Sequence, residues 1–284
     1  MSRLVLMDGA ALIYRSYFAF IRNPLINSRG EETSASYGIA TALLMIRRTY
    51  QPDYLAFVLD TIEPTFRHER YPAYKATREK MPDSLAAQLP RVRELVASFG
   101  VPIVEAPGFE ADDVIGTLAR RAEDSGMEVL VASSDKDLCQ LVSDRVRVLV
   151  PGREGSAWLL LDAEGVRERL GVPPGRVIDL LALMGDSSDN VPGVPGVGEK
   201  TARKLIDEIG SLDEILASPE KAPTRKAQEA LRDNRDVALL SRDLVTLRTD
   251  LDLPVTIHDL VVRSPDLASL RALFESLEFS RLFG

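Results

Sequence analysis

Residues 129–137 read VLVASSDKD, in which four apolar residues that favour β-strands are followed closely by Asp135 and Asp137. Two earlier apolar runs of the same kind also end at an acid, at Asp8 and Asp60. Strands that are apolar along their whole length are typical of a parallel sheet buried on both faces. Because the carboxyl ends of parallel strands border one crevice, these acids are expected to meet there. The pattern therefore predicts an α/β sheet with a polar site at one edge.

Apolar, β-prone runs and helix-like segments alternate through the first half of the chain. The runs cover residues 4–7, 54–59, 101–104, 129–132 and 146–150. Segments with the 3.6-residue apolar period of a helix lie between most of them, at residues 35–50, 85–99 and 111–125. Strands that alternate with helices indicate a parallel sheet with helices on both faces. We expect this α/β core to extend over residues 1–172.

A mainly helical region is expected to follow, over residues 173–284. The strand signal fades there, and short helical patterns separated by Gly and Pro take its place, at residues 177–184, 200–209, 212–217, 228–240 and 267–274. Within the core, residues 65–83 (TFRHERYPAYKATREKMPD) are dense in Arg, Lys and Tyr and are interrupted by Pro72 and Pro82. This segment is expected to be an exposed excursion from the core.

Acidic residues are concentrated at positions that the fold should bring together. Beyond the acids at strand ends, some open the helix-like segment 111–125 and others lie in GDSSDN at 185–190: Glu110, Asp112, Asp113, Asp186 and Asp189. Carboxylates gathered in one crevice raise one another's pKa unless a cation compensates them. Oxygen ligands without nearby His or Cys favour Mg²⁺ or Mn²⁺ over zinc, and two such ions about 4 Å apart can hold the oxygens of a phosphodiester during hydrolysis. Any one of these acids alone could instead be a helix cap or a turn residue, so the prediction rests on their joint placement.

The overall charge does not decide for or against a nucleic-acid partner. The formal net charge is −8, which is unfavourable for contact with phosphates. If the acids named above form one cluster, however, the rest of the 43 acids nearly balance the 35 Lys and Arg residues, so DNA contact depends on local patches. The single cysteine excludes an intramolecular disulfide, and no apolar run approaches the roughly 20 residues of a membrane span. We expect a cytoplasmic protein with no membrane partner.

A glycine-rich turn precedes one of the predicted helices, at residues 193–202 (GVPGVGEKTA). Glycine allows positive φ angles and lets a phosphate approach the backbone N–H groups at a helix start. The pattern predicts a helix-hairpin-helix grip on the DNA backbone, which carries no base specificity, and a plain helix-turn-helix loop is the alternative. The residues concerned are Gly193, Gly196, Gly198, Lys200, Thr201, Arg203 and Lys204.

Five segments of the chain resemble, in order, the signatures of a known family. They are MDGAALIYRSYFAF (7–20), TFRHERYPAYKATREKMPD (65–83), GFEADDVIGTLA (108–119), SSDKDLCQLV (133–142) and LMGDSSDNVPGVPGVGEKTA (183–202). Together they resemble the 5′→3′ exonuclease domain of bacterial DNA polymerase I, a relative of the flap endonucleases. The resemblance implies a PIN-like α/β core with two metal ions, a helical arch over the site, and a helix-hairpin-helix region that grips duplex DNA and binds K⁺ through backbone carbonyls.

The resemblance also assigns roles to individual residues. The first metal ion would be bound by Asp8, Asp60, Glu110 and Asp112, and the second would be surrounded by Asp113, Asp135, Asp137, Asp186 and Asp189. In the arch, Lys75 and Arg78 would contact the scissile phosphate. Arg15 and Arg67 would contact neighbouring phosphates, and a terminal base would stack on Tyr14.

The resemblance implies an enzyme that hydrolyses DNA near a 5′ end or at the base of a 5′ flap, using metal-bound water as the nucleophile. Its partners would be DNA with 5′ ends, flaps or nicks, including RNA-primed strands, and a polymerase domain in cis or in trans; we expect a monomer. One departure is the pair Ser133-Ser134 in the turn before the acids of residues 135–137. Two alternatives are a non-catalytic module that binds branched DNA and a PIN-type ribonuclease. The complete set of second-metal acids argues against the first, and the glycine-rich DNA grip argues against the second.

Overall fold

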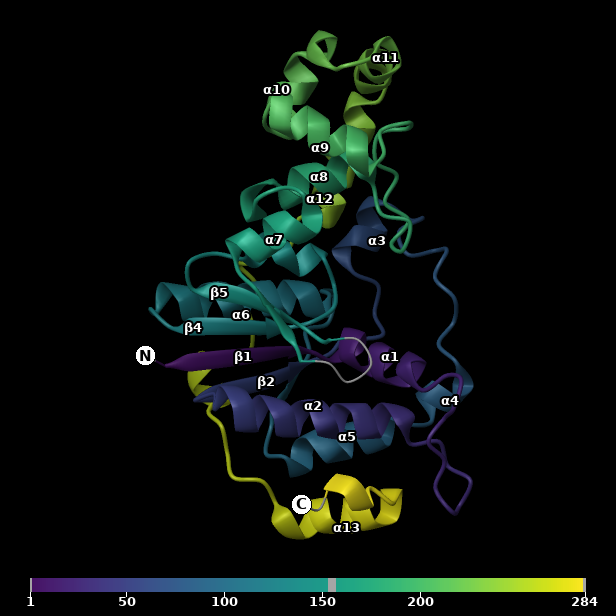
Figure 1. Cartoon of the computed structure of the whole chain (residues 1–284), viewed down its shortest axis with the longest axis vertical. Coiled ribbons are helices and arrows are strands. Elements are labelled where there is room, and N and C mark those ends of the chain that lie inside the picture. The colour runs from purple at the N-terminus through teal and green to yellow at the C-terminus, as the bar shows by residue number, and fades with distance from the viewer. Residues whose placement is uncertain (1, 153–156, 283–284) are drawn as a thin grey trace.

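The computed structural model describes residues 2–152 and 157–282, and a six-stranded sheet forms its centre (Figure 1). The strand order is β3-β2-β1-β4-β5-β6. The bounds are β1 (Arg3–Asp8), β2 (Tyr54–Val58), β3 (Ile103–Val104), β4 (Glu128–Ala132), β5 (Val146–Val150) and β6 (Leu159–Leu161). Strands β1 to β5 pair in parallel, and β6 joins β5 antiparallel. All strands predicted from the sequence are present, and only the three-residue β6 was missed.

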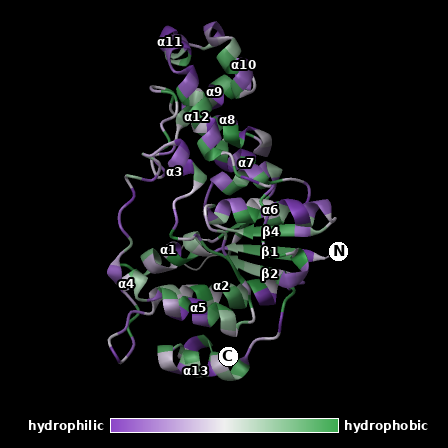
Figure 2. Ribbon diagram, turned by 180° about the vertical axis from the view of Figure 1, so that it is seen from behind, coloured by the Kyte–Doolittle hydropathy of each residue, from purple (hydrophilic) through white to green (hydrophobic). Residues whose placement is uncertain are grey.

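Alternate residues of each strand enter two separate cores, one on each face of the sheet. Val5 and Met7 of β1 pack with α1 (Gly9–Ala19), α2 (Ser34–Tyr50) and α5 (Leu89–Ser98). Leu4 and Leu6 pack with α6 (Ala111–Asp124) and with the helices that follow the sheet. Figure 2 shows the strands as apolar between helices of mixed polarity. The predicted parallel sheet with helices on both faces is therefore confirmed.

The helical region lies above the sheet in Figure 1. Its helices are α8 (Val177–Met184), α9 (Glu199–Glu208), α10 (Leu212–Ala217), α11 (Arg225–Asp233) and α12 (Arg235–Val245), and α7 (Ala163–Leu170) precedes it at the end of the core range. The predicted helix at residues 228–240 is broken at Asn234, whose side chain donates to the Ala230 carbonyl at 2.9 Å. In the described ranges, no helix has the length and apolarity that crossing a bilayer requires.

The last helix, α13 (Leu267–Leu277), does not stay with the helical region. It lies at the opposite end of the molecule in Figure 1, beside α5. Its buried residues Leu270 and Phe274 belong to the same core as Val5 and Met7 of β1. The chain reaches this position past β2, where Val262 donates to the Asp53 carbonyl at 2.9 Å. The predicted helical region 173–284 therefore ends, by packing, before its last helix.

The excursion at residues 65–83 leaves the sheet after β2 and contains little helix. Its helical parts are α3 (Phe66–Arg70) and the first residue of α4 (Asp83–Ala86), and the rest is divided between turns and irregular chain. The helical arch that the resemblance implied is thus mostly non-helical. The predicted helix at residues 85–99 is also divided, into α4 and α5, because Pro90 in the first turn of α5 has no backbone N–H with which to continue the helix.

Candidate active site

Acids from several strand ends line a cavity of about 710 Å³ beneath the excursion. Its lining includes Asp8, Asp60, Asp112, Asp135, Lys75 and Arg78. A neighbouring cavity of about 300 Å³ shares Asp135 and Arg78 and is also lined by Asp137, Asp186 and Asp189. The structure thus brings most of the predicted metal-binding acids to the carboxyl edge of the sheet.

Asp8 is fixed at the junction between β1 and α1. Its Oδ1 accepts from the Ala11 N–H at 3.0 Å and caps the helix, and its Oδ2 accepts from the Ser133 hydroxyl at 2.5 Å. Burial raises the pKa of Asp8 to about 7, although the hydrogen bond from Ser133 opposes this shift. Ser133, one of the two serines in the departing turn, also accepts from the Asp135 N–H at 2.9 Å. Sequence reasoning gave Ser133 no such role.

Two more acids are destabilised as anions. Burial, followed by the charges of Asp8 and Asp135, raises the pKa of Asp112 well above its usual value. Burial and Asp135 raise the pKa of Asp137 to about 7. The Oδ1 atom of Asp137 is buried without a hydrogen-bond partner among the described residues, and Lys136 Nζ lies 3.6 Å away. This environment favours a bound cation, because a nearby positive charge stabilises each anion.

The other acids are compensated by cations of the protein itself. Lys75 Nζ lies 2.5 Å from Glu110 Oε1 and 3.7 Å from Asp189 Oδ2. Burial disfavours the charged amine, but these two carboxylates outweigh burial and raise the pKa of Lys75. Arg78 binds Asp189 at 2.5 Å. As they stand in residues 2–152 and 157–282, no three acids are close enough to hold a metal ion together.

Lys136 compensates the charge of Asp186, with which it forms an ion pair. Burial opposes the charge on Lys136, yet Asp137 and Asp186 raise its pKa to about 12. In turn, Lys136 outweighs the effect of burial on Asp186 and lowers the pKa of that carboxyl. Lys136 was not singled out from the sequence, although its place between two cluster acids, Asp135 and Asp137, could have indicated it.

Backbone contacts hold the excursion against the loop that carries Asp189. The Lys75 N–H donates to the Asp189 carbonyl at 2.9 Å, and Asn190 Nδ2 donates to the Ala73 carbonyl at 2.6 Å. The Tyr74 hydroxyl, another group missed from the sequence, donates to Asp189 at 2.8 Å. Lys75 has a φ of +55°, a conformation that costs energy for a side chain of this size. The basic side chains are therefore set at a fixed position over the acids.

Asp113 and Arg67 do not join the cluster. The Arg67 guanidinium donates to both oxygens of Asp113, at 2.6 and 2.8 Å, and both side chains are buried. Arg67 also donates to the Leu244 carbonyl at 2.7 Å, and Asp113 accepts from the Arg248 N–H at 2.9 Å. In the structure, Asp113 therefore lies outside the acid cluster, and the Arg67 guanidinium is turned to Asp113 rather than to the protein surface. Both residues join the base of the excursion to α6 and to the segment that follows α12.

The remaining predicted DNA contacts vary in exposure. Tyr14 lines the larger acid cavity, whereas Arg15 donates to the Gly152 carbonyl. In the glycine-rich turn, Gly193 is buried against Gly185, where a side chain would collide with backbone atoms. Gly196 and Gly198 are exposed, as are Lys200 and Lys204, while Thr201 is half-buried. Arg203 is paired with Glu199 and packs against Gly171, so its charge is partly used within the protein.

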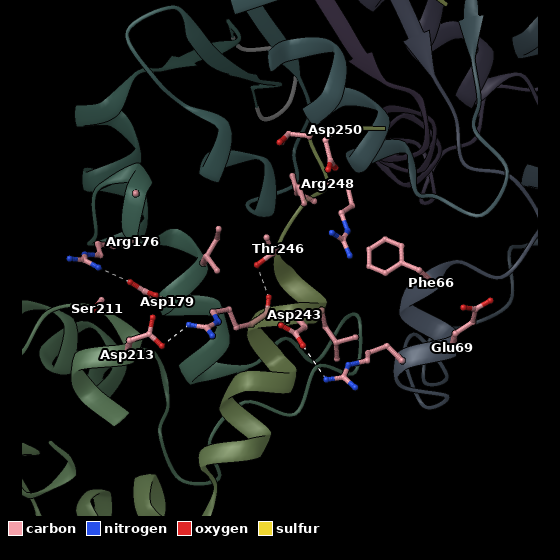
Figure 3. A pocket seen from close by; sticks show the side chains of 17 residues that line it. Phe66, Glu69, Arg176, Asp179, Ser211, Asp213, Asp243, Thr246, Arg248 and Asp250 are labelled. Atoms are coloured by element: carbon pink, nitrogen blue, oxygen red, sulfur yellow. Dashed lines mark hydrogen bonds and ion pairs between the residues drawn. The ribbon is translucent and has the colours of Figure 1, made fainter. Parts of the chain in front are cut away.

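A cavity of about 1160 Å³, larger than those at the acids, lies between α3, α8, α10 and α12 (Figure 3). Most of its charged side chains form ion pairs: Arg176 with Asp179, Arg242 with Asp213, and Arg70 with Asp243. The opposite charges within each pair compensate each other, unlike the mutually repelling acids at the strand ends. We therefore place the chemistry at the smaller cavities.

Comparison with known proteins places the chain in a family. Residues 3–171 match the model of the 5′-3′ exonuclease N-terminal resolvase-like domain, and residues 172–268 match that of the 5′-3′ exonuclease C-terminal SAM fold. The chain is 41% identical to DNA polymerase I of Bacillus caldotenax and 43% identical to the thermostable DNA polymerase I of Thermus filiformis. These matches cover 98% and 99% of the chain but only 31% and 32% of the relatives, so the chain spans about a third of their length.

Solved structures share the fold at low sequence identity. A structure described as divalent metal ions (zinc) bound to T5 5′-exonuclease has a TM-score of 0.71 at 21% identity, with 98% of each chain covered. The catalytic core of Rad2 in complex with DNA substrate has a TM-score of 0.61 at 18% identity, with 97% of this chain and 87% of that chain covered. The resemblance seen in the five sequence segments is confirmed by these matches and by the family models. The chain belongs to the 5′-3′ exonuclease family.

Proposed function

We propose that the chain is a structure-selective 5′ nuclease that hydrolyses DNA phosphodiesters at 5′ ends and at the base of 5′ flaps. The observation that carries this proposal is the set of buried, mutually repelling acids at the strand ends, covered by basic side chains of the excursion. Acids that repel one another are stabilised by bound divalent metal ions. The Lys and Arg side chains over these acids can bind a phosphodiester. This activity implies a role in DNA replication and repair, in which the protein would remove primers and flaps in the cytoplasm.

Two Mg²⁺ or Mn²⁺ ions would suit the chemistry of these acids, which would have to move closer together to hold them. The unpartnered Asp137 oxygen and the raised pKa values of Asp8 and Asp112 are the features that a cation would relieve. Asp8, Asp60, Glu110 and Asp112 would hold one ion, and Asp135, Asp137, Asp186 and Asp189 the other. When bound, such ions supply a hydroxide nucleophile and neutralise the charge of the transition state.

The side chains of the excursion would hold the scissile phosphate. Lys75 and Arg78 rest on Glu110 and Asp189 in the structure, so these acids keep both cations charged and directed at the cavity. A phosphate at the strand ends would meet the same two cations, which stabilise the charge that develops during hydrolysis. No side-chain nucleophile is required. Tyr14, which lines this cavity, would stack on a terminal base.

The glycine-rich turn before α9 would grip the DNA backbone outside the cleavage site. Its exposed Lys200 and Lys204 and the exposed N–H groups at the helix start suit phosphates. A K⁺ ion bound by backbone carbonyls of this turn is part of the proposal. Residues 1–172 would form the nuclease core and residues 173–284 the DNA-binding region, although α13 packs back on the core.

The larger assembly is also a proposal. The relatives are DNA polymerases of about three times this length, so we propose that a polymerase domain acts with this chain in cis or in trans. DNA with 5′ ends, flaps or nicks, including RNA-primed strands, would be the substrate. A single copy contains every acid of the site, and we propose that it acts as a monomer.

The test is cleavage of an end-labelled 5′-flap duplex with Mg²⁺ or Mn²⁺, beside an EDTA control and an Asp135→Ala variant. Cleavage near the junction that needs metal and is lost in the variant would support the proposal. Tight binding of the flap without cleavage under either metal would favour a non-catalytic branched-DNA module. Preferential cleavage of RNA would favour a PIN-type ribonuclease instead.

A further inference from the structure

Helix α1 presents two aromatic rings to the cavity that holds the acids. Tyr14 and Phe18 are one helical turn apart, and both line the cavity of about 710 Å³. Their ring centroids are 6.2 Å apart and their planes differ by 24°, which is a stacked arrangement. Phe18 is 50% exposed. Single exposed apolar side chains are ordinary on protein surfaces, but this one lies in the same cavity as Asp8 and Asp60.

The Phe18 ring is held from its inner side. The buried Tyr17 ring meets it edge to face, with centroids 5.2 Å apart and an interplanar angle of 82°. Tyr17 is itself fixed by a hydrogen bond of 2.8 Å between its hydroxyl and that of Ser84. A ring braced in this way loses little rotamer freedom when a ligand covers its exposed side, so stacking on it has a small entropic cost.

The lining of the same cavity also includes apolar and cationic groups from the excursion. Met81 and Pro82 contribute the apolar part, and Arg78 and Lys80 contribute the positive charge. The Lys80 side chain is 90% exposed. Aromatic platforms beside cations are the combination that binds single-stranded nucleic acid, because exposed base faces stack on the rings while phosphates meet the cations. Bases within a duplex are already stacked on one another and cannot use such a platform.

The position of Phe18 fits an unpaired strand that leaves the cleavage site. Phe18 follows Asp8 by ten residues along α1, and a helix rises 1.5 Å per residue, so the ring lies on the order of 15 Å from the acids. That length corresponds to about four nucleotides at the 3.4 Å spacing of a duplex strand, and to fewer in an extended strand.

We propose that Phe18 extends the stacking surface already assigned to Tyr14 to further unpaired bases of the 5′ strand, and that Phe18 thereby adds to the affinity for substrates with an unpaired 5′ strand. The proposal rests on the proposed nuclease function and deepens it. It assigns Phe18 as a residue that determines specificity and leaves the chemical step to the acids.

The test compares Phe18→Ala and Phe18→Leu with wild type on three DNA substrates. The first has a 5′ flap of ordinary nucleotides, the second has the same flap made abasic over its first four positions from the junction, and the third is a nicked duplex. We expect both variants to raise KM for the ordinary flap by about tenfold, within the range of base–aromatic stacking, with kcat nearly unchanged. On the abasic flap and the nick, the variants and wild type should have similar KM values.

Ile21→Ala is the matched control, because Ile21 is 51% exposed just beyond α1 and does not line the cavity.

A binding measurement in EDTA separates this inference from the function on which it rests. With 2-aminopurine at successive flap positions, wild type should quench the fluorescence at one or two positions within the first four, and Phe18→Ala should not. Equal losses on all three substrates, or unchanged KM and quenching in Phe18→Ala, would overturn the stacking role. Self-association that Phe18→Ala abolishes, with flap binding unchanged, would overturn it in favour of a protein contact. Absence of metal-dependent cleavage by wild type would overturn the nuclease function, while the quenching would still report on the platform.

Discussion

Asp112 and Asp113 are neighbours in the first turn of α6, but their carboxylates lie in opposite environments. Asp112 faces the crevice at the strand ends, where burial and the charges of Asp8 and Asp135 raise its pKa well above the usual value. Asp113 faces inward, and both its oxygens accept hydrogen bonds from Arg67. Successive residues of a helix point about 100° apart, so one turn can supply both a reactive acid and a structural one.

The comparison separates acids that destabilise the metal-free fold from acids that stabilise it. In buried, mutually repelling carboxylates such as Asp8, Asp112 and Asp137 the anionic form is costly, and a bound cation would remove this cost. A paired acid such as Asp113 is already satisfied, and its removal would deprive the buried Arg67 of the carboxylate that accepts two of its hydrogen bonds. Removal of Asp112 should therefore lower activity and raise the stability of the metal-free protein. Removal of Asp113 should mainly lower stability.

The largest expected effect is on cleavage by Asp112→Asn. Loss of this carboxylate should lower the single-turnover rate on a 5′ flap by about a thousandfold, because the acid would hold a catalytic cation. Its removal also relieves repulsion of Asp8, so the metal-free variant should unfold at a higher temperature than wild type. Asp124→Asn, at the other end of the same helix, is the control and should change neither property, since its side chain is 62% exposed. A fully active Asp112→Asn would place this acid outside the chemistry.

The next largest effect is on stability, in Asp113→Asn. Breaking a buried ion pair by removing one partner costs about 3–5 kcal/mol, so thermal unfolding should occur roughly 10 °C lower. Arg67→Met should cost a similar amount, and the double variant should recover part of the loss because no charge is left unpaired. Calorimetry of the four proteins gives the coupling energy. If Asp113→Asn kept its stability and lost cleavage as completely as Asp112→Asn, the distinction between the two acids would be wrong.

The sequence was sufficient to place most of the acids at the strand ends, but not to identify the side chains that pair with the acids. Asp8, Asp60 and Asp135 could be placed because strand ends of a parallel sheet share one edge, which is a consequence of local pattern alone. The two adjacent aspartates of α6 could not be told apart, since the partner of Asp113 is Arg67, 46 residues away in sequence. Such a pairing depends on tertiary packing, as does the return of α13 to the sheet core. A local pattern contains neither.

A smaller effect concerns pH in the metal-free protein. The folded-state pKa of Asp8 and of Asp137 is about 7, above the value of 3.8 for a free side chain. The folded state therefore keeps protons that the unfolded chain has released, so folding stability should fall as pH rises from about 4 to 7. The slope is at most about 1.4 kcal/mol per pH unit for each proton concerned.

Thermal unfolding in EDTA across this pH range measures the slope, and Asp8→Asn should reduce it. Asp186 is the internal contrast, because its lowered pKa confines its own effect to pH below about 4, where stability falls as the carboxyl is protonated. Added Mg²⁺ should stabilise the protein more at pH 7 than at pH 5. An unfolding temperature in EDTA that rose steadily from pH 5 to 7 would contradict the raised folded-state pKa of Asp8 and Asp137.

The smallest effect is expected for Ser133→Ala, a variant that tests how the acids at the strand ends are held in place. The Ser133 hydroxyl donates to Asp8 and accepts from the Asp135 N–H, so it orients two acids at neighbouring strand ends. Because its hydrogen bond opposes the burial effect on the pKa of Asp8, the variant should raise that pKa further and move the acidic limb of the pH–rate profile upward. The rate at neutral pH should fall by about threefold to tenfold, the equivalent of one typical hydrogen bond. Ser134→Ala is the matched control, since Ser134 contributes its backbone carbonyl, to Arg169, rather than its hydroxyl. A shift of the pH profile in Ser133→Ala alone would show that this turn sets the charge state of Asp8, whereas equal behaviour of the two variants would assign Ser133 a packing role only.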